Sequence, residues 1–497
     1  MTMKMSTRGI SGFIMGLCLI ISCCINAQAA EETLPYAYNN LKYGLIKNSS
    51  IAVTDTGFVR IMNTADALYI EECSDDFNVI TRKEIDRELD YYGGFYCGAD
   101  AYYFVFGQNN EEEDNDKEVV RVVKYSKDWK RLGAAKITGN AKAFGQQVRY
   151  PFHYGNVSMA EYGGVLYIVT GHEGYVDSLY GQGHQGFLMF AVDESTMTGS
   201  IKAADLWHSF SQHLAINDSG EIYVLEESDG DRMSKVTRYN ANSTDSKKVP
   251  VLEYGGTHTS AWAIATYASA NAVALSDSNV LAVGTSIDQS RYDDEDYTKS
   301  YNIYLTVTPM NNFTQDATTL KWITNDNLTR GYRDVKLTRI SNDRFLLMWE
   351  QYESEDSIAT GDDYDSMSAH VLHYEFLDGS GNVIGSEHKA AAAISECEPV
   401  IKNGKAVFYS SDGGCVAFYS IDTATGAFDK KIYKLAGENA QWDYADGVLT
   451  VSGIGELYAD MGSATFGAIK DKVRKLVVSD GITKINEKSF YGLTSLS

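Results

Sequence analysis

Short apolar runs separated by polar turns recur along most of the chain, and they predict β-strands. The clearest stretch is Tyr162 to Tyr239, in which one phrase occurs twice: a glycine turn, an apolar strand, a polar loop and a second strand. From about Leu41 to Lys434 we count roughly seven blocks of about 45 to 65 residues with this pattern. Runs such as FLLMW and YYFVF are continuously apolar. They indicate strands buried on both faces.

This repetition is typical of a β-propeller, in which four-stranded sheets stand radially around an axis. We therefore predict an all-β chain with a β-propeller over residues 38–436, with seven blades favoured and eight or six as alternatives. Acidic runs at Glu111–Glu118, Asp293–Tyr297 and Gly361–Ser366 fall between strand-like runs. We interpret these runs as solvated hairpin loops.

Residues 437–497 carry a different pattern, which predicts a second, shorter module. Its characteristic positions are Trp442, Gly447–Gly453, Gly455, Val473, Leu476–Val478, Asp480–Ile482, Ile485, Phe490 and Leu493. These positions resemble the BspA-type leucine-rich repeat of bacterial surface proteins. The resemblance implies a leucine-rich-repeat-like β module that is incomplete, because a solenoid normally needs three or more repeats to bury its faces.

Residues 1–29 have the features of a signal peptide. Lys4 and Arg8 precede an apolar run from Ile10 to Ile25, and Ala27-Gln28-Ala29 fits a cleavage site. The alternative is a lipoprotein, because the residues up to Cys23 resemble a lipobox. Both interpretations predict a secreted or cell-surface protein, and no transmembrane segment is expected in the mature chain.

Four cysteines follow the predicted leader: Cys73, Cys97, Cys397 and Cys415. In an exported protein they allow two disulfides, for which the favoured pairing joins Cys73 to Cys97 and Cys397 to Cys415. Buried free thiols are the other interpretation.

Composition restricts the class of partner. Hydrophobic residues make up 44% of the chain, which excludes general disorder, and 43 Gly against 5 Pro agrees with many tight turns. The formal charge of -24 argues against nucleic acid and anionic membranes, because their recognition needs clustered Lys and Arg. It also disfavours a highly anionic polysaccharide.

Histidines are concentrated in one region and supply the candidate binding site. Five of the nine lie between residues 153 and 213. The ligand-binding candidates are His153, His172, Glu173, His184, Gln185, His208 and Gln212. Imidazole, amide and carboxylate groups that converge in a funnel can bind sugar hydroxyls or perform acid/base chemistry. Alternatively, hydrogen bonds between blades use these groups structurally.

The alternation of a strand makes a specific prediction for residues 208–213. His208 and Gln212 should share one face, whereas Ser209, Ser211 and His213 should share the other. His208 and Gln212 could then line one wall that His213 cannot reach.

No metal motif is complete, and no cofactor is expected. Asp229 and Asp231 are candidates for Ca²⁺, but the rest of an EF-hand loop is missing, so a plain turn is favoured. The phrases Gly183-His184-Gln185, His208-Ser209-Phe210-Ser211-Gln212 and Asp229-Gly230-Asp231 resemble a poorly characterised group of secreted clostridial-type proteins. That resemblance implies a location rather than a reaction.

Two functions remain open at this point. We favour an exported binding or adhesion protein whose propeller rim recognises a carbohydrate or a protein. The alternative is a polysaccharide lyase or glycoside-active enzyme. A lyase would need a base, a proton donor and a cation. His208 with Tyr154 or Tyr180 could supply the base and the proton donor. Arg232 or Arg149 could supply the cation.

Overall fold

The fold is described from a computed structural model of the chain. The described residues are 46–496 except 65–66, 140–145, 154, 177–180, 242–244, 257–265, 293–300, 326–331, 353–369, 393, 413–414, 460, 462–465 and 467–468. The predicted signal peptide, Cys23, Tyr154, Tyr180 and the acidic runs at Asp293–Tyr297 and Gly361–Ser366 lie outside them. In the part of the chain that is described, no helix is long and apolar enough to cross a membrane.

Residues 49–204 form three antiparallel sheets of consecutive strands. Sheet 1 contains β1 (Ser49–Thr54), β2 (Gly57–Asn63), β3 (Leu68–Ser74) and β4 (Val79–Ile85). Sheet 2 contains β5 (Tyr91–Cys97), β6 (Ala101–Gly107), β7 (Glu118–Ser126) and β8 (Arg131–Thr138). Sheet 3 contains β10 (Val157–Tyr162), β11 (Val165–Glu173), β12 (Gln185–Asp193) and β13 (Thr198–Ala204), with β9 (Tyr150–Pro151) paired to the end of β11.

Four further sheets continue the pattern. Sheet 4 contains β14 (Ser209–Ile216), β15 (Glu221–Ser228), β16 (Met233–Asn240) and β17 (Ser246–Glu253). Sheet 5 contains β18 (Ala272–Leu275), β19 (Asn279–Ser286), β20 (Asn302–Pro309) and β21 (Thr319–Trp322), with 3₁₀ turns η1 (Gln289–Arg291), η3 (Met310–Asn312) and η4 (Gln315–Ala317). Sheet 6 contains β22 (Tyr332–Ser341), β23 (Arg344–Tyr352), β24 (His370–Leu377) and β25 (Val383–Ala390). Sheet 7 contains β26 (Val400–Lys402), β27 (Lys405–Asp412), β28 (Cys415–Asp422) and β29 (Phe428–Ala445).

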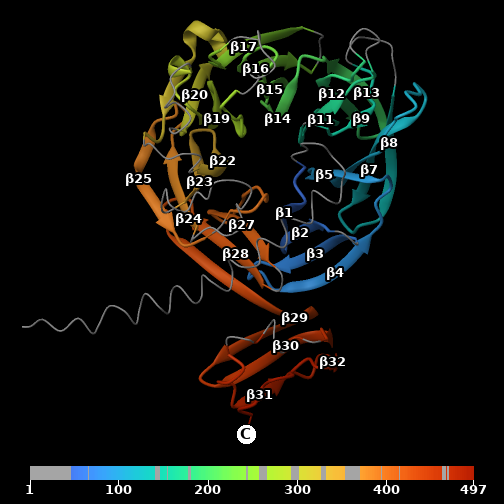
Figure 1. Cartoon of the computed structure of the whole chain (residues 1–497), viewed down its shortest axis with the longest axis vertical. Helices are drawn as coiled ribbons and strands as arrows, with labels where there is room; N and C mark the ends of the chain where they lie inside the picture. Colours follow the sequence, from blue (N-terminus) through green and yellow to red (C-terminus); the bar gives the residue numbers. More distant parts are fainter. Residues whose placement is uncertain are drawn as a thin grey trace, which may run out of the picture.

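The seven sheets stand side by side around a ring (Figure 1). The first strands of neighbouring sheets contact one another, from β1 through β5, β10, β14 and β18 to β22, and β26 contacts β1. Strands in the middle of each sheet are buried on both faces, as in β6, where every residue is buried. Outer strands such as β13 alternate between exposed and partly buried positions. The prediction of an all-β, propeller-like chain is confirmed.

Sheets 1 and 7 are each built from strands that are consecutive in the sequence, so no pairing of described strands joins one sheet to the other. Side chains make the connection between them instead. The Lys402 ammonium donates to the carbonyl oxygens of Thr54 at 2.9 Å and Gly57 at 3.0 Å. The Tyr409 hydroxyl donates to the buried Ile61 carbonyl at 3.1 Å. The first and last sheets of the ring are therefore joined by specific hydrogen bonds as well as by apolar packing.

The two ends of the ring carry different connections. We call the end at which the first strands begin the entry end. Connections from first to second strands, at the opposite end, are short, such as 55–56 and 163–164. Second and third strands are joined at the entry end, where 108–117 is the longest of the connections that are described throughout. The acidic run at Glu111–Glu118 forms mostly exposed turns there and leads into β7, as predicted. Long loops on a rigid scaffold are where binding residues concentrate.

The C-terminal residues extend sheet 7. Strand β29 runs through the predicted boundary at residue 437 and pairs with β30 (Val448–Leu457). Strands β31 (Lys475–Val478) and β32 (Ile482–Lys484) then pair with β30 in parallel. A separate apolar core contains Trp442, Leu449, Val451 and Phe466.

Of the four cysteines that follow the predicted leader, Cys73, Cys97 and Cys397 are free thiols. Cys73 and Cys397 are buried, and Cys97 is partly buried. The favoured disulfide between Cys73 and Cys97 is therefore wrong, because each belongs to a different sheet and carries a free thiol. The Cys415 side chain lies outside the described residues, but the free thiol of Cys397 excludes its predicted bridge as well.

Candidate functional site

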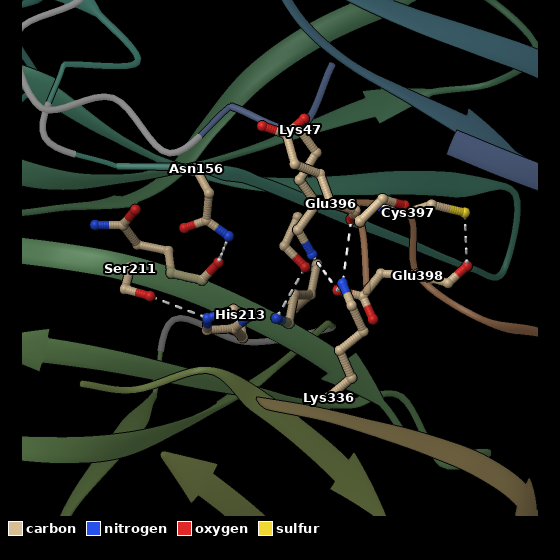
Figure 2. Close-up of polar contacts among 12 residues, drawn as sticks. Lys47, Asn156, Ser211, His213, Lys336, Glu396, Cys397 and Glu398 are labelled. Atoms are coloured by element: carbon tan, nitrogen blue, oxygen red, sulfur yellow. Dashed lines mark hydrogen bonds and ion pairs between the residues drawn. The ribbon is translucent and has the colours of Figure 1, made fainter. Parts of the chain in front are cut away.

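Charged side chains from widely separated parts of the sequence meet at the entry end of the ring. Lys47 precedes β1, Lys336 lies in β22, and Glu396 and Glu398 precede β26. Figure 2 shows them beside His213 of β14. We call Lys47, Ser211, His213, Lys336, Glu396 and Glu398 the central cluster. It was not predicted, because these residues are up to about 350 positions apart and come together only when the ring closes.

Glu398 is the carboxylate that both lysines of the central cluster contact. Lys47 forms an ion pair with it, and the Lys336 ammonium lies 3.6 Å away. Lys336 also donates to the Glu396 carbonyl oxygen at 3.3 Å. Removal from bulk water would raise the pKa of Glu398, but the two ammonium groups hold it down to about 2. Glu398 is therefore ionised at neutral pH, and 47% of its side chain remains accessible because it faces a cavity.

A bulge in β14 brings His213 into this cluster. The pairing with β15 shifts between Phe210 and His213, and Ser211 adopts a positive φ of 52°. The Ser211 hydroxyl donates to the Ala270 carbonyl oxygen at 2.5 Å, and His213 Nε2 lies 3.1 Å from the same oxygen. Burial, reinforced by the charge of nearby lysines, lowers the pKa of His213 to about 4. His213 is thus neutral at physiological pH.

The predicted alternation along residues 208–213 is wrong because of this bulge. Gln212 donates from Nε2 to the Ser209 hydroxyl at 3.0 Å, although the two residues were expected on opposite faces. The main-chain carbonyl oxygen of Gln212 accepts from the Asn156 side-chain amide at 2.6 Å. Gln212 is fully buried, so it serves contacts between sheets 3 and 4 and does not line an open wall. His208 lies directly before the strand. Its φ of 51° is not that of an extended strand, so the alternation of faces along β14 does not include it.

Buried polar groups continue from Ser209 across sheet 4. Ser209 donates to Glu226 at 2.5 Å, and Glu226 lies 3.4 Å from the Lys235 ammonium. Lys235 in turn contacts Asp231 at 2.8 Å, and Lys248 contacts the same carboxylate oxygen at 2.8 Å. Such a network fixes the strands because a buried charge left without its partner is costly. Asp231 is therefore engaged by two cations.

The other calcium candidate has a different partner. Its Oδ1 atom, on Asp229, lies 3.2 Å from His208 Nδ1, and interaction with this carboxylate raises the pKa of His208. Within the described ranges, no group of three or more His, Cys, Asp or Glu side chains could hold an ion. The Ca²⁺ assignment stays a prediction.

The residue before this histidine has an exposed aromatic side chain. Trp207 directly precedes His208 and is 59% exposed. The ring of His184 lies 5.8 Å from that of His208, centroid to centroid. We call Trp207, His208, Asp229 and His184 the rim cluster. Trp207 was not predicted, although an isolated Trp outside any apolar run was a usable signal in the sequence.

The remaining predicted residues lie in sheet 3. His172 is fully buried in β11, and Gln185 begins β12 opposite Glu173. His153 Nδ1 lies 3.8 Å from Glu173 Oε2, and its ring stacks on Tyr150 at 4.8 Å. The structure thus brings together His184 with His208, and His153 with Glu173, but it does not gather all seven residues in one funnel.

The cations proposed for a lyase are engaged elsewhere. Arg232 donates to the Gly255 carbonyl oxygen and lies over the Tyr292 ring at 5.5 Å. Arg149 Nε lies 3.8 Å from a carboxylate oxygen of Glu113, and its guanidinium lies over Tyr150 at 4.9 Å.

A cavity of about 600 Å³ lies between the first strands of sheets 1, 2 and 3 and the start of sheet 7. Its wall includes the hydroxyl-bearing residues Ser49, Ser50 and Ser158. Lys47 and Glu398 are the two charged residues among those that line it. We call it the central cavity. A space of this size, with a few polar groups on a mostly apolar wall, is typical of a small-molecule site.

No protein family and no curated protein matches the sequence. Among solved structures, the chain is similar to a proposed 6-phosphogluconolactonase from Bacteroides uniformis, with a TM-score of 0.42 and 8% identity over 78% of this chain and 96% of that one. It is also similar to one of two prolyl endopeptidases, with a TM-score of 0.42 and 12% identity over 85% of this chain and 56% of that one. The polysaccharide lyase Uly1 gives a TM-score of 0.41 and 8% identity over 71% of this chain and 84% of that one. Similarity at this level carries no inference about activity.

Proposed function

We propose that the protein is an exported binding protein that recognises a carbohydrate at the entry end of its ring. The observation that carries this proposal is the rim cluster. An exposed indole offers a flat apolar face, on which the C–H groups of a sugar ring can stack. His208 follows Trp207 directly in the chain, and its imidazole lies near Asp229 and His184, which together offer hydrogen-bond donors and acceptors for sugar hydroxyls.

Export and surface attachment belong to the same proposal. They are supported by the basic and apolar pattern of residues 1–29 and by the C-terminal strands. The parallel register aligns Leu449 with Leu476 and Val451 with Val478, so similar residues stack in consecutive strands. This stacking is what a leucine-rich repeat requires.

A test of carbohydrate binding is a glycan array probed with the purified protein and with Trp207→Ala. We expect binding to weaken by at least about tenfold. Stacking of a ligand ring on an aromatic side chain contributes on the order of 1–3 kcal/mol in the comparable case of nucleic-acid bases. Trp322→Ala is the matched control, since Trp322 is also exposed, at 39%, but lies on β21 in sheet 5. Equal binding by the protein and Trp207→Ala would refute the proposal.

The alternative is a polysaccharide lyase, and His208 is the observation that favours it. Its half-buried imidazole is held by Asp229, as a general base would be. The array experiment is therefore accompanied by ultraviolet detection of unsaturated uronate products. Product formation that is lost in His208→Ala would replace the binding proposal with the enzymatic one.

A further inference from the structure

Charged groups of both signs meet at the wall of the central cavity. Two ammonium groups, from Lys47 and Lys336, contact the single carboxylate of Glu398. Lys336 is 6% exposed and lies behind Glu398, whereas Lys47 is 34% exposed and lines the cavity. The Lys47 ammonium is therefore the cation that an entering ligand can reach.

Of the titratable groups in the central cluster, Glu398 is the carboxylate that both lysines contact, and Glu396 and His213 have other partners. The carboxylate of Glu396 accepts from the main-chain N–H of Asn48 at 2.6 Å. His213 is neutral at physiological pH, because burial and the two lysines hold its pKa at about 4. It can exchange hydrogen bonds but adds no charge.

Hydroxyl groups lie within the same cavity. Ser49 and Ser50 of β1 and Ser158 of β10 form part of its wall. Hydroxyl side chains both donate and accept hydrogen bonds, so they suit the hydroxyl groups of a ligand. The carboxylate of Glu398 is a further hydrogen-bond acceptor for the hydroxyl groups of the ligand.

Charge outside the cavity limits the size of the anion. The loop Glu111–Asp116 lies at the entry end, and five of its six residues are Asp or Glu. The whole chain has a formal charge of -24. Such a surface repels a polyanion, but a single charge next to Lys47 is screened less within the cavity than outside it.

We propose that the central cavity binds a small hydroxylated monocarboxylate, such as an acidic monosaccharide unit, with Lys47 contacting its carboxylate. Lys336 is a positioning residue that holds Glu398 in place. The proposal deepens the carbohydrate function by naming the charged class of sugar, but it concerns a different group of residues from the rim cluster.

The test compares D-glucuronate with D-glucose as probes, using calorimetry and NMR of the protein with isotope-labelled histidine. We expect glucuronate to bind at least about tenfold more tightly than glucose, as one charge-assisted hydrogen bond provides. Lys47→Ala should abolish this preference, whereas Lys47→Arg should keep it. Lys83→Ala is the control, because Lys83 on β4 also forms an ion pair, with Glu72 at 3.6 Å.

His213 gives a second readout that needs no variant. Glucuronate should shift the His213 ring resonances of the unaltered protein, whereas glucose should shift them less. The proposal is overturned if glucuronate does not bind, if it binds no more tightly than glucose, or if its binding leaves His213 unchanged. Glycan binding that depends on Trp207 without a glucuronate preference would refute this inference alone. A glucuronate preference that depends on Lys47 without any effect of Trp207→Ala would refute only the rim proposal.

Discussion

Lys402 offers the sharpest test of how the ring is closed. Its ammonium donates to the carbonyl oxygens of Thr54 and Gly57 and forms an ion pair with Asp75. Lys402→Met removes these contacts but keeps much of the side-chain stem that packs near Phe58. The variant therefore isolates the polar part of the junction between sheets 1 and 7.

The magnitude follows from the surroundings of each contact. Hydrogen bonds from a charged donor contribute about 1.5–3 kcal/mol each, so two would contribute roughly 3–6 kcal/mol. Residues 55–56, between the two acceptors, are exposed, so water can replace part of this loss. The Asp75 side chain is 56% exposed, so its ion pair adds little. We expect a loss of about 2–3 kcal/mol in the free energy of unfolding.

The assay is hydrogen exchange of amides in β1 and β2, together with urea unfolding, because exchange reports local opening of the junction. Lys405→Met is the matched control: Lys405 is exposed at the start of β27, and its loss should cost less than about 0.5 kcal/mol. Tyr409→Phe should cost about 1 kcal/mol through the lost bond to Ile61. Equal effects of Lys402→Met and Lys405→Met would refute side-chain closure of the ring.

Two further predictions concern titratable side chains. Burial first, and then the charge of a neighbouring aspartate, raises the pKa of Glu227 to about 7. The carboxyl ionises near pH 4.5 in the unfolded chain but stays protonated up to about pH 7 in the fold, so the free energy of unfolding falls between these pH values and is constant above them. Glu227→Gln should therefore stabilise by about 1–2 kcal/mol near pH 8 and by nothing near pH 4. Unfolding midpoints at both pH values check this, and an equal effect at both would contradict it. Burial raises the pKa of the Cys73 and Cys397 thiols to about 12, so in a Cys415→Ser background a maleimide should label the more accessible Cys97 first, as mass spectrometry of peptides can show. Labelling of the three thiols at one rate would contradict the described burial.

Local patterns in the sequence were sufficient to predict the strands. YYFVF became the fully buried β6, and the acidic run after it became the exposed turn before β7, because both follow from local polarity. The histidines that cluster in the sequence lie in or next to the consecutive sheets 3 and 4. These inferences use only residues within one sheet or two consecutive sheets.

The central cluster could not be predicted in the same way. Lys47 and Glu398 meet only because the first and last sheets are adjacent in the ring, and nothing local to either residue indicates this. The bulge at Ser211 is a second case. A positive φ at a residue other than glycine leaves no compositional signal, yet it reverses the expected faces of the residues that follow.

Strand β14 connects the two proposed contact regions physically. Trp207 and His208 lie just before it on the rim, whereas His213, after the bulge, belongs to the central cluster. Between them, Ser209 and Gln212 are tied to the buried charges of sheet 4 and to Asn156 of sheet 3. Because a buried network of this kind resists rearrangement, the rim and the cavity are held at a fixed separation. A ligand that reaches both would meet a preorganised surface, which reduces the entropy lost on binding.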